Sequence, residues 1–467
     1  MPMKKVIIFL CASFVFLTTE GQVLQNYIQE LSGYAADSSI VREWKEGYCV
    51  MYTSTTGGNY YFHVIDIVSG AVWSIASQDR VSDMEIIGDT LYFCGNDLLN
   101  YPTVGVFYIP NVLTNNVIVY KFRYPTRHTI VPKRMDAIRV SNGFHVFVTG
   151  DFTFENINVP FSFMADVSRF NSPGSWYVYY YVTGGKECFE DVAATDNYVV
   201  TTGHIDYTQD VVIRVFERPN NVCFLAPNAS HHHMFYNPTL CDYMYFYNGN
   251  AMKPIEFHGY RSISITHTVT DKVAVAYLAE LSSKFGLTIK AIDISAGIPI
   301  PQVEVNAAWI PEKYNVRDIR YDENTDSLLI LQEKNSNVFS GTTSGYMVMT
   351  DYGTFSTLLD LESTWPIWVR SIDKFNALAM GKIFCGEGTW DGTNIPVLST
   401  SASDGSSCFV RTPESFFTDS FKLQSCHVPI EGVGYQSIIS YVYAPTTIIS
   451  TINTLCYEQN RQSSSNQ

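Results

Sequence analysis

The stretch DMEIIGDTLYF (Asp83–Phe93) joins an acidic residue, an alternating apolar run, a Gly-Asp turn and a second apolar run. This is the pattern of two antiparallel strands connected by a tight turn. The chain repeats it as DAIRVSNGFHVF from Asp136 and as DIRYDENTDSLLI from Asp318. Related phrases begin at Glu43, Glu190, Ser264 and Ser371. The repetition predicts that one hairpin unit recurs along the chain.

The copies are spaced by about 53 residues in most intervals, and the spacing is longer only where an insertion follows Phe216. Further strand-like runs follow each copy, such as YYFHVIDI (Tyr60–Ile67) and AVWSI (Ala71–Ile75) after the first. A period near 50 built from short strands is typical of a β-propeller, whose blades bury aromatic and β-branched residues against one another. We therefore expect an all-β fold: a single β-propeller with four-stranded antiparallel blades.

The number of blades is less sharply defined by the repeat. The chain has seven good copies and a partial eighth, YQSIISYVYAPTTIISTI (Tyr435–Ile452). Closing a ring commonly pairs strands from the two chain ends, which removes an exposed sheet edge. Ser437–Tyr443 is our candidate for the closing strand. We expect seven blades, and eight are the alternative if residues 23–34 also contribute.

Composition supports one large β domain. The 467 residues include 31 Tyr and 29 Phe but only 16% charged residues, which favours pleated, half-buried surfaces over exposed helices. No Pro/Ser-rich linker divides the chain. We expect a signal peptide over residues 1–21, a propeller domain over residues 22–458 and a disordered polar tail over residues 459–467.

The first residues, MPMKKVIIFLCASFVFLTTEGQ, have the order of a secretory signal peptide: two lysines, an apolar core and a small, polar end before Gln22. The core is too short to span a bilayer, and no later stretch reaches the roughly 20 apolar residues of a membrane helix. The style of the signal is bacterial. The expected location is therefore outside the cytoplasm, in the periplasm, at the cell surface or in the medium, without a membrane span.

The net charge of −15, without any Lys/Arg-rich run, argues against nucleic acid as a partner. Binding a phosphate backbone needs a concentrated positive surface. An acidic surface more simply keeps a secreted protein soluble.

Ten cysteines are present, and one of them, Cys11, lies in the signal segment. An oxidising compartment permits disulfides, so sequence proximity suggests three pairs. These pairs are Cys223–Cys241, Cys385–Cys408 and Cys426–Cys456. Cys49 and Cys94 occupy similar places in consecutive repeats and could be buried thiols, and Cys188 is left over. The alternative is that most of the cysteines are small buried hydrophobic residues.

Carboxylates recur at the start of the expected innermost strand of several blades, as Asp83, Asp136, Glu190 or Asp191, and Asp318. Such positions converge on one mouth of a propeller channel, where they could bind a calcium-like cation or a polyhydroxylated ligand. The alternative is that each acid pairs with an arginine of a neighbouring blade and fixes blade packing. Arg134, Arg317 and Arg370 sit beside these positions. Unpaired, crowded carboxylates would have raised pKa values.

The insertion from Asn221 to Asn250 is rich in aromatic residues. Rings on a loop can stack on sugars or anchor a protein partner. The candidates are Tyr236, Tyr243, Tyr245 and Tyr247. The alternative is that alternate tyrosines pack within a long strand. Three adjacent histidines in the same insertion would point in different directions, so no metal site is predicted there.

The segment VIDIVSGAVW (Val64–Trp73) resembles the outer hairpin of quinoprotein-type, PQQ-like propeller repeats, with Asp66, Gly70 and Trp73 at matching offsets. A second segment, AIDISAGIPI from Ala291, matches less well because it lacks the tryptophan. The resemblance implies the propeller fold but does not imply a quinone cofactor. As a whole, the chain resembles secreted bacterial β-propellers that have no assigned function, and no cofactor is expected.

Three functions are compatible with these features. The first is a secreted binding or scaffold protein that engages a glycan or a cell-surface protein through loops at one face. The second is a carbohydrate-active enzyme, a hydrolase or lyase, that uses the channel-mouth carboxylates. The third is a structural surface protein. No Gly-x-Ser-x-Gly elbow, phosphate loop or His-Glu-x-x-His motif is present, so the first is favoured.

Overall fold

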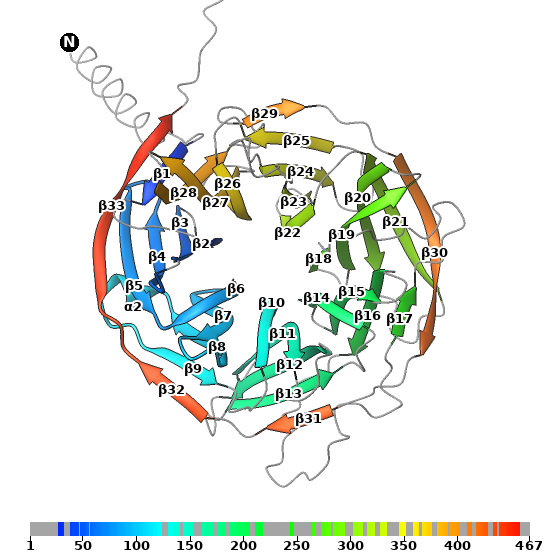
Figure 1. The fold of residues 1–467 in the computed structure, drawn as a ribbon, viewed down its shortest axis with the longest axis horizontal. Coiled ribbons are helices and arrows are strands. Elements are labelled where there is room, and N and C mark those ends of the chain that lie inside the picture. Colours follow the sequence, from blue (N-terminus) through cyan, green and yellow to red (C-terminus); the bar gives the residue numbers. More distant parts are fainter. Residues whose placement is uncertain are drawn as a thin grey trace, which may run out of the picture.

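The computed structural model is all-β and arranges its strands around a central axis (Figure 1). The residues that it describes are 27–31, 38–45, 47–55, 57–123, 129–140, 143–153, 161–170, 176–182, 187–195, 197–205, 211–217, 243–246, 263–267, 272–281, 284–294, 302–311, 315–322, 327–333, 345–351, 358–363, 367–375, 381–390, 393–401, 409–412, 417–427, 433–436 and 439–457. The predicted signal peptide and polar tail lie outside these residues.

The strands form antiparallel, blade-like units, and each unit is named here by its innermost strand. The β2 unit contains β2 (Ser38–Lys45), β3 (Tyr48–Ser54), β4 (Tyr60–Asp66) and β5 (Ala71–Ser77). The β6 unit contains β6 (Asp79–Ile87), β7 (Thr90–Asp97), β8 (Pro102–Tyr108) and β9 (Val119–Arg123), with the short helix α2 (Pro110–Leu113) between β8 and β9. The β10 unit contains β10 (Thr129–Val140), β11 (Gly143–Thr153), β12 (Phe161–Phe170) and β13 (Trp176–Val182).

The same order continues through the second half of the chain. The β14 unit contains β14 (Glu187–Ala194), β15 (Tyr198–Ile205), β16 (Val211–Glu217) and β17 (Tyr243–Phe246). The β18 unit contains β18 (Ile263–His267), β19 (Lys272–Leu281), β20 (Lys284–Asp293) and β21 (Gln302–Pro311). The β22 unit contains β22 (Asn315–Asp322), β23 (Ser327–Glu333), β24 (Gly345–Asp351) and β25 (Leu358–Ser363).

The last unit combines strands from both ends of the chain. The β26 unit contains β26 (Ile367–Phe375), β27 (Gly381–Trp390), β28 (Thr393–Ser401) and the early strand β1 (Tyr27–Leu31). The pairing of β1 with β28 places Ile28 opposite Ser399 and Glu30 opposite Val397. An N-terminal strand therefore completes this unit. The prediction of Ser437–Tyr443 as the closing strand is wrong, because β32 (Ile439–Tyr443) pairs with β9 instead.

The C-terminal strands run along the outer edges of the units and form the outermost layer in Figure 1, where they are coloured orange to red. This C-terminal belt consists of β29 (Phe409–Thr412), β30 (Phe417–His427), β31 (Val433–Gln436), β32 and β33 (Thr447–Tyr457). Their partners, in the same order, are β25, then β21 and β17, then β13, then β9, and finally β5 and β1. Belt and units thus follow the ring in opposite directions.

The belt corrects the interpretation of residues 435–452 as a partial eighth repeat. These residues contribute outer strands to the β10, β6 and β2 units rather than a unit of their own. Pairing satisfies backbone N–H and C=O groups that an unpaired outer edge would expose. Because β30 and β33 each pair with two units, the belt also joins neighbouring sheets.

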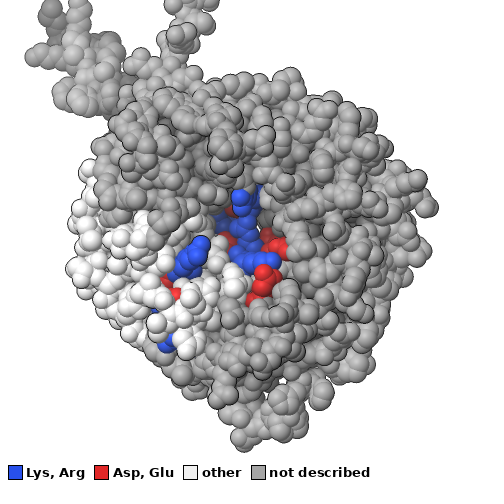
Figure 2. Space-filling model, viewed as in Figure 1, with Lys and Arg blue, Asp and Glu red and all other residues white. Residues whose placement is uncertain are grey.

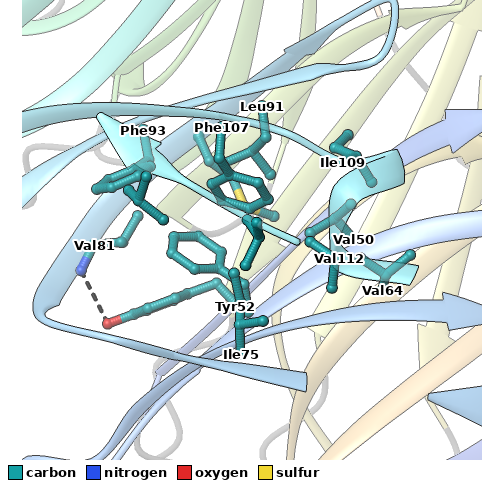
Figure 3. Close-up of a cluster of buried hydrophobic side chains, with 14 of the residues drawn as sticks. Val50, Tyr52, Val64, Ile75, Val81, Leu91, Phe93, Phe107, Ile109 and Val112 are labelled. Carbon is teal, nitrogen blue, oxygen red and sulfur yellow. Dashed lines mark hydrogen bonds between the residues drawn. The ribbon is translucent and has the colours of Figure 1, made fainter. Parts of the chain in front are cut away.

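The core lies between adjacent units. Between the β2 and β6 units, Phe62 contacts Phe93 and Phe107 with ring centroids 5.1 and 5.2 Å apart. The hydroxyl of Tyr52 accepts the backbone N–H of Val81 at 2.9 Å, the dashed bond in Figure 3. A unit cannot cover its own faces, so stacking against neighbours provides the burial that stabilises it.

Equivalent buried clusters join other neighbours. Tyr92 and Cys94 of the β6 unit pack with Met135 and Phe144 of the β10 unit. Residues of the β18 and β22 units form another cluster, which includes Leu287 and Ile330. No helix in the described part of the chain is long and apolar enough to cross a membrane.

Candidate functional site

Charged side chains gather around the central hollow of the ring, where Figure 2 shows Lys and Arg in contact with Asp and Glu. The innermost strands supply four of the predicted carboxylates, which are Asp83 on β6, Asp136 on β10, Asp191 on β14 and Asp318 on β22. The β-ladder shifts register directly before Asp83, Asp191 and Asp318. A β-bulge re-aims the side chains beside it, so this irregularity sets the direction of these acids.

Each of these aspartates binds its own backbone in the same way. One carboxylate oxygen accepts the N–H of the following residue, at 2.9 Å for Asp83, 2.7 Å for Asp136, 2.8 Å for Asp191 and 3.1 Å for Asp318. All four side chains belong to buried residues. Hydrogen bonds from N–H groups are what a buried carboxylate needs to replace water.

The second oxygen of three of these carboxylates reaches the neighbouring unit. Oδ2 of Asp83 accepts the N–H of Met135 at 3.1 Å, and Oδ2 of Asp136 accepts the N–H of Ala194 at 2.7 Å. Asp318 lies 3.4 Å from the hydroxyl of Ser371, which in turn accepts the N–H of Val41 at 3.4 Å. The repeated acid therefore links the innermost strand of its own unit to the next.

Arg42 lies at the centre of this network, and its side chain is only 1% exposed. Its Nη2 contacts Oδ1 of Asp83 at 2.9 Å, and its Nη1 lies 3.6 Å from Oδ2 of Asp318. The guanidinium also donates to Ser371 Oγ at 2.9 Å, to the carbonyl of Met84 at 2.9 Å and to the carbonyl of Val41 at 2.7 Å. One side chain of the β2 unit thus joins the β6, β22 and β26 units.

Two further arginines extend across the hollow. Arg320 of the β22 unit contacts Glu85 of the β6 unit at 2.8 Å. Arg134 of the β10 unit donates to the backbone carbonyl of Arg317 in the β22 unit. At the edge of the network, Lys133 contacts Glu190 at 3.2 Å and Asp151 at 3.0 Å. Ion pairs and a hydrogen bond of the described side chains thus connect units around the hollow.

Burial raises the pKa of two acids in the network. The pKa of Asp318 rises to about 6 because loss of water outweighs the attraction of Arg42 and Arg134. Burial likewise raises the pKa of Glu85 to about 8, against the effect of Arg42. A carboxyl that titrates near neutral pH is a candidate general acid or base. Asp318 is 5% exposed, however, and its oxygens already face donors from the protein.

Oxygens of three of these carboxylates face hydrogen-bond donors of the protein. Calcium requires six to eight oxygen ligands, whereas the acids described above direct their oxygens at N–H groups and arginines. Among the described residues, no group of three or more His, Cys, Asp or Glu could hold a metal ion. Asp83 and Asp318 contact an arginine of another unit, as in the packing alternative of the sequence analysis, but that arginine is Arg42 rather than Arg134, Arg317 or Arg370. Asp136 accepts two backbone N–H groups instead.

Sequence reasoning missed Arg42, Glu85 and Arg320. Glu85 and Arg320 each stand two residues after a recognised aspartate, and residues i and i+2 of a strand share one face. This spacing could have indicated that Glu85 and Arg320 lie on the same face as the recognised aspartates. Arg42 was overlooked because it stands directly before Glu43, the residue at which the first copy of the phrase was taken to begin.

The aromatic candidates are only partly described. Tyr243 and Tyr245 lie on β17, which pairs with β16 on one side and with β30 on the other. The structure thus places their backbone in an outer strand rather than in a loop. Tyr236 and Tyr247 lie outside the described residues.

The predicted disulfides fare differently from one another. Cys385 carries a buried thiol, as do Cys49 and Cys94, which contradicts the predicted Cys385–Cys408 pair. The reason is that β27 directs Cys385 into the core beside the β2 unit. Cys426 on β30 is the cross-strand partner of Met244 in the β14 unit, whereas Cys456 on β33 is the cross-strand partner of Ile28 on β1. Their strands, β30 and β33, lie on opposite sides of the ring in Figure 1, too far apart for a disulfide. Cys223, Cys241 and Cys408 lie outside the described residues.

Comparisons with known proteins add a structural likeness. No family model and no curated protein matches the sequence. Among solved structures, the chain is similar to the WD40 domain of SCAP from fission yeast. The identity is 6% and the TM-score is 0.36, and the match covers 81% of this chain and 98% of that domain.

Proposed function

We propose that this protein is a secreted, non-catalytic binding or scaffold protein, built on a single closed seven-bladed propeller, that engages its partner through loops at one face. The observation that carries the proposal is that the acids of the channel contact other groups of the protein. Asp83 and Asp318 each bind a backbone N–H group and contact Arg42, and Asp136 binds two backbone N–H groups, so they do not present a pair of carboxyls to a sugar. Glycoside hydrolysis needs two such carboxyls flanking the bond to be cleaved.

The proposed blade count is supported by the innermost strands and by the closing pair. The innermost strands are β2, β6, β10, β14, β18, β22 and β26. The pairing of β1 with β28 gives the last of these units its fourth strand. Secretion is supported by the signal-like first 21 residues.

One hairpin tip favours a cell-surface protein over a glycan as the partner. Leu98 and Leu99, in the turn between β7 and β8, are 64% and 70% exposed. Asp97 fixes this turn, because its Oδ1 accepts the N–H groups of Leu99 and Tyr101 at 2.8 and 2.9 Å. Arg123 contacts Asp97 at 3.0 Å and lies over the ring of Tyr101 at 3.6 Å. A rigid tip with two exposed leucines suits a protein pocket, since little entropy is lost on binding.

The experiment compares binding with two matched variants. Purified residues 22–467 are screened by thermal unfolding against a panel of glycans and divalent cations, and by crosslinking to intact cell surfaces. A ligand of the native state raises the melting temperature. We expect Leu98→Ser/Leu99→Ser to weaken crosslinking at least tenfold, and Val68→Ser to leave it unchanged. Val68 is 69% exposed but lies in the β4–β5 turn, at the opposite end of the strands.

Three results would contradict the proposal. Turnover of a glycan by the purified protein would establish the enzyme alternative. A glycan-specific rise in melting temperature, without surface crosslinking, would replace the protein partner by a sugar. If no ligand of the panel changed the melting temperature and no crosslinking to cell surfaces occurred, the structural role would remain as the function.

A further inference from the structure

A buried ion pair connects two strands of the β6 unit. Asp79 begins β6, the innermost strand, and Lys121 lies on β9, the fourth strand of the same unit. The Nζ of Lys121 contacts Oδ1 of Asp79 at 2.8 Å, and the two side chains are only 5% and 0% exposed. Charges removed from water in this way must be compensated by hydrogen bonds to the protein, or they destabilise the fold.

The hydrogen bonds to the Asp79 carboxyl all fall on one of its oxygens. Oδ1 accepts the hydroxyl hydrogen of Thr103 at 2.9 Å in addition to its contact with Lys121. Oδ2 is buried and has no hydrogen-bond partner among the described residues. Burial raises the pKa of the Asp79 carboxyl, against the effect of Lys121 and Thr103. An ionised carboxylate with one oxygen that lacks a donor is therefore a costly state for this site.

The surrounding residues hold both reacting groups in place. The N–H of Asp79 donates to Oγ of Ser77 at 3.1 Å, and the hydroxyl of Tyr52 donates to the carbonyl of Asp79 at 3.1 Å. The Nζ of Lys121 lies over the ring of Tyr443 in the C-terminal belt, 5.4 Å from its centroid. The amine and the carboxyl are thus fixed in contact, which gives a reaction between them a high effective concentration.

We propose that Lys121 and Asp79 form an isopeptide bond, an amide between the two side chains that ties β9 to the start of β6. Lys121 first transfers one proton to Asp79, so that a neutral amine faces a neutral carboxylic acid. The nitrogen then attacks Cγ, and the Thr103 hydroxyl stabilises the negative charge that develops on Oδ1. The N–Cγ bond forms and the Cγ–Oδ2 bond breaks. Oδ2 leaves as water with the proton of the acid and one proton from the nitrogen, so the reaction needs no further reactant.

The product no longer contains the two buried charges. The oxygen that leaves is the one without a partner, and the oxygen that remains as the amide carbonyl keeps its hydrogen bond from Thr103. The bond also closes a loop of the chain from residue 79 to residue 121. A crosslink of this kind removes conformational freedom from the unfolded chain and so stabilises the fold.

The test measures the mass of purified residues 22–467 after denaturation and full reduction. We expect a mass that is lower than that of the sequence by one water molecule. Trypsin does not cleave after an acylated lysine, so digestion should give a branched peptide in which Lys121 carries the peptide that contains Asp79. The unchanged mass of the sequence, or a loss of water that maps to any other residues, would overturn the proposal.

Two lysine variants separate the amide from the ion pair. Lys121→Arg keeps a positive charge beside Asp79 but has no nucleophilic amine, so it should show the full mass and linear peptides. Lys133→Arg is the matched control, because Lys133 contacts Glu190 and Asp151 at 3.2 and 3.0 Å but is 28% exposed. It should lose one water, as the wild type does. A loss of water that persists in Lys121→Arg would contradict the assignment, and if that variant fails to fold, the branched peptide of the wild type decides.

Discussion

Asp83 Oδ1 accepts a hydrogen bond from Nη2 of Arg42 at 2.9 Å, and its Oδ2 accepts the N–H of Met135 at 3.1 Å. These three residues come from the β2, β6 and β10 units, so one buried carboxylate connects three consecutive units of the ring. A charge removed from water must be compensated by such contacts, or it destabilises the fold. Asp83, a ligand candidate in the sequence, is therefore part of the polar core.

Asp136 tests the backbone part of this role. Its two oxygens accept the N–H groups of Ala137 and Ala194, both at 2.7 Å. Asp136→Asn replaces one acceptor by an NH₂ group, which leaves a buried N–H facing another donor. We expect a loss of about 1–3 kcal/mol in the free energy of unfolding, measured with urea. Asp151→Asn is the control, because Asp151 is 40% exposed and its contact with Lys133 should contribute at most about 1 kcal/mol. Equal losses in the two variants would refute the role of Asp136.

The burial of His63 should make the stability of the fold depend on pH below 6.5. His63 is fully buried between the hydroxyls of Thr53 and Ser74, at 2.9 and 2.8 Å, and burial lowers its pKa from 6.5 to about 3. Below pH 6.5 the unfolded chain binds a proton that the folded protein does not, so stability falls as the pH decreases towards 3. The expected loss is about 1.4 kcal/mol per pH unit.

The pH dependence is measured by comparing His63→Gln with the wild type at several pH values between 7 and 4. We expect the variant to lose this component of the slope, whatever its stability at pH 7. Parallel stability curves for the two proteins would show that His63 does not titrate as predicted.

Gly95 tests the packing of β7 against β6. An alanine Cβ at this position would overlap the carbonyl oxygen of Arg80 and lie 2.8 Å from Cα of Val81. Because backbone atoms cannot move aside, Gly95→Ala should destabilise the protein by about 1–3 kcal/mol. At Gly57, a new Cβ would make only ordinary contacts, the nearest at 3.6 Å. Gly57→Ala should therefore stay within about 0.5 kcal/mol of the wild type in the same denaturation assay.

Removing the last two strands of the C-terminal belt should expose strand edges and cause the protein to associate. Ending the chain after Gln436 removes β32 and β33 and leaves the outer edges of β9, β5 and β1 without these partners. Exposed strand edges pair with other chains, so we expect concentration-dependent oligomers in light scattering after size-exclusion chromatography. Ending the chain after Tyr457 keeps the whole belt and should match the full chain. A truncated protein that stays monomeric would show that the belt does not protect these edges.

The inner hairpins were predictable because their signal is local. The alternation around the turn after Ile87 places Asp83 and Phe93 on paired strands, and β6 and β7 form there. The same reasoning located the hairpins that begin near Asp136, Asp191 and Asp318. Each depends only on a period of two and on a turn, both of which are visible in one short segment.

The belt and the arginine network were not predictable for the opposite reason. The alternating pattern of β32 and β33 fits an outer strand of any unit, and nothing in residues 439–457 specifies β9 or β5 as the partner. Arg42 and Asp318 are far apart in the sequence and come into contact only when the ring closes, so no sequence spacing predicts this contact. Tertiary pairing of this kind is set by the whole fold.

Urea unfolding of Arg42→Met, beside the exposed control Arg80→Met, is the most direct test of the channel network. If the channel network holds the units together, removing Arg42 leaves Asp83 and Asp318 buried without this partner. The free energy of unfolding should then fall by about 3–5 kcal/mol. The control should stay within about 0.5 kcal/mol of the wild type. An Arg42→Met protein as stable as the wild type would contradict the account, because the channel carboxylates would then not depend on Arg42 for their place in the fold.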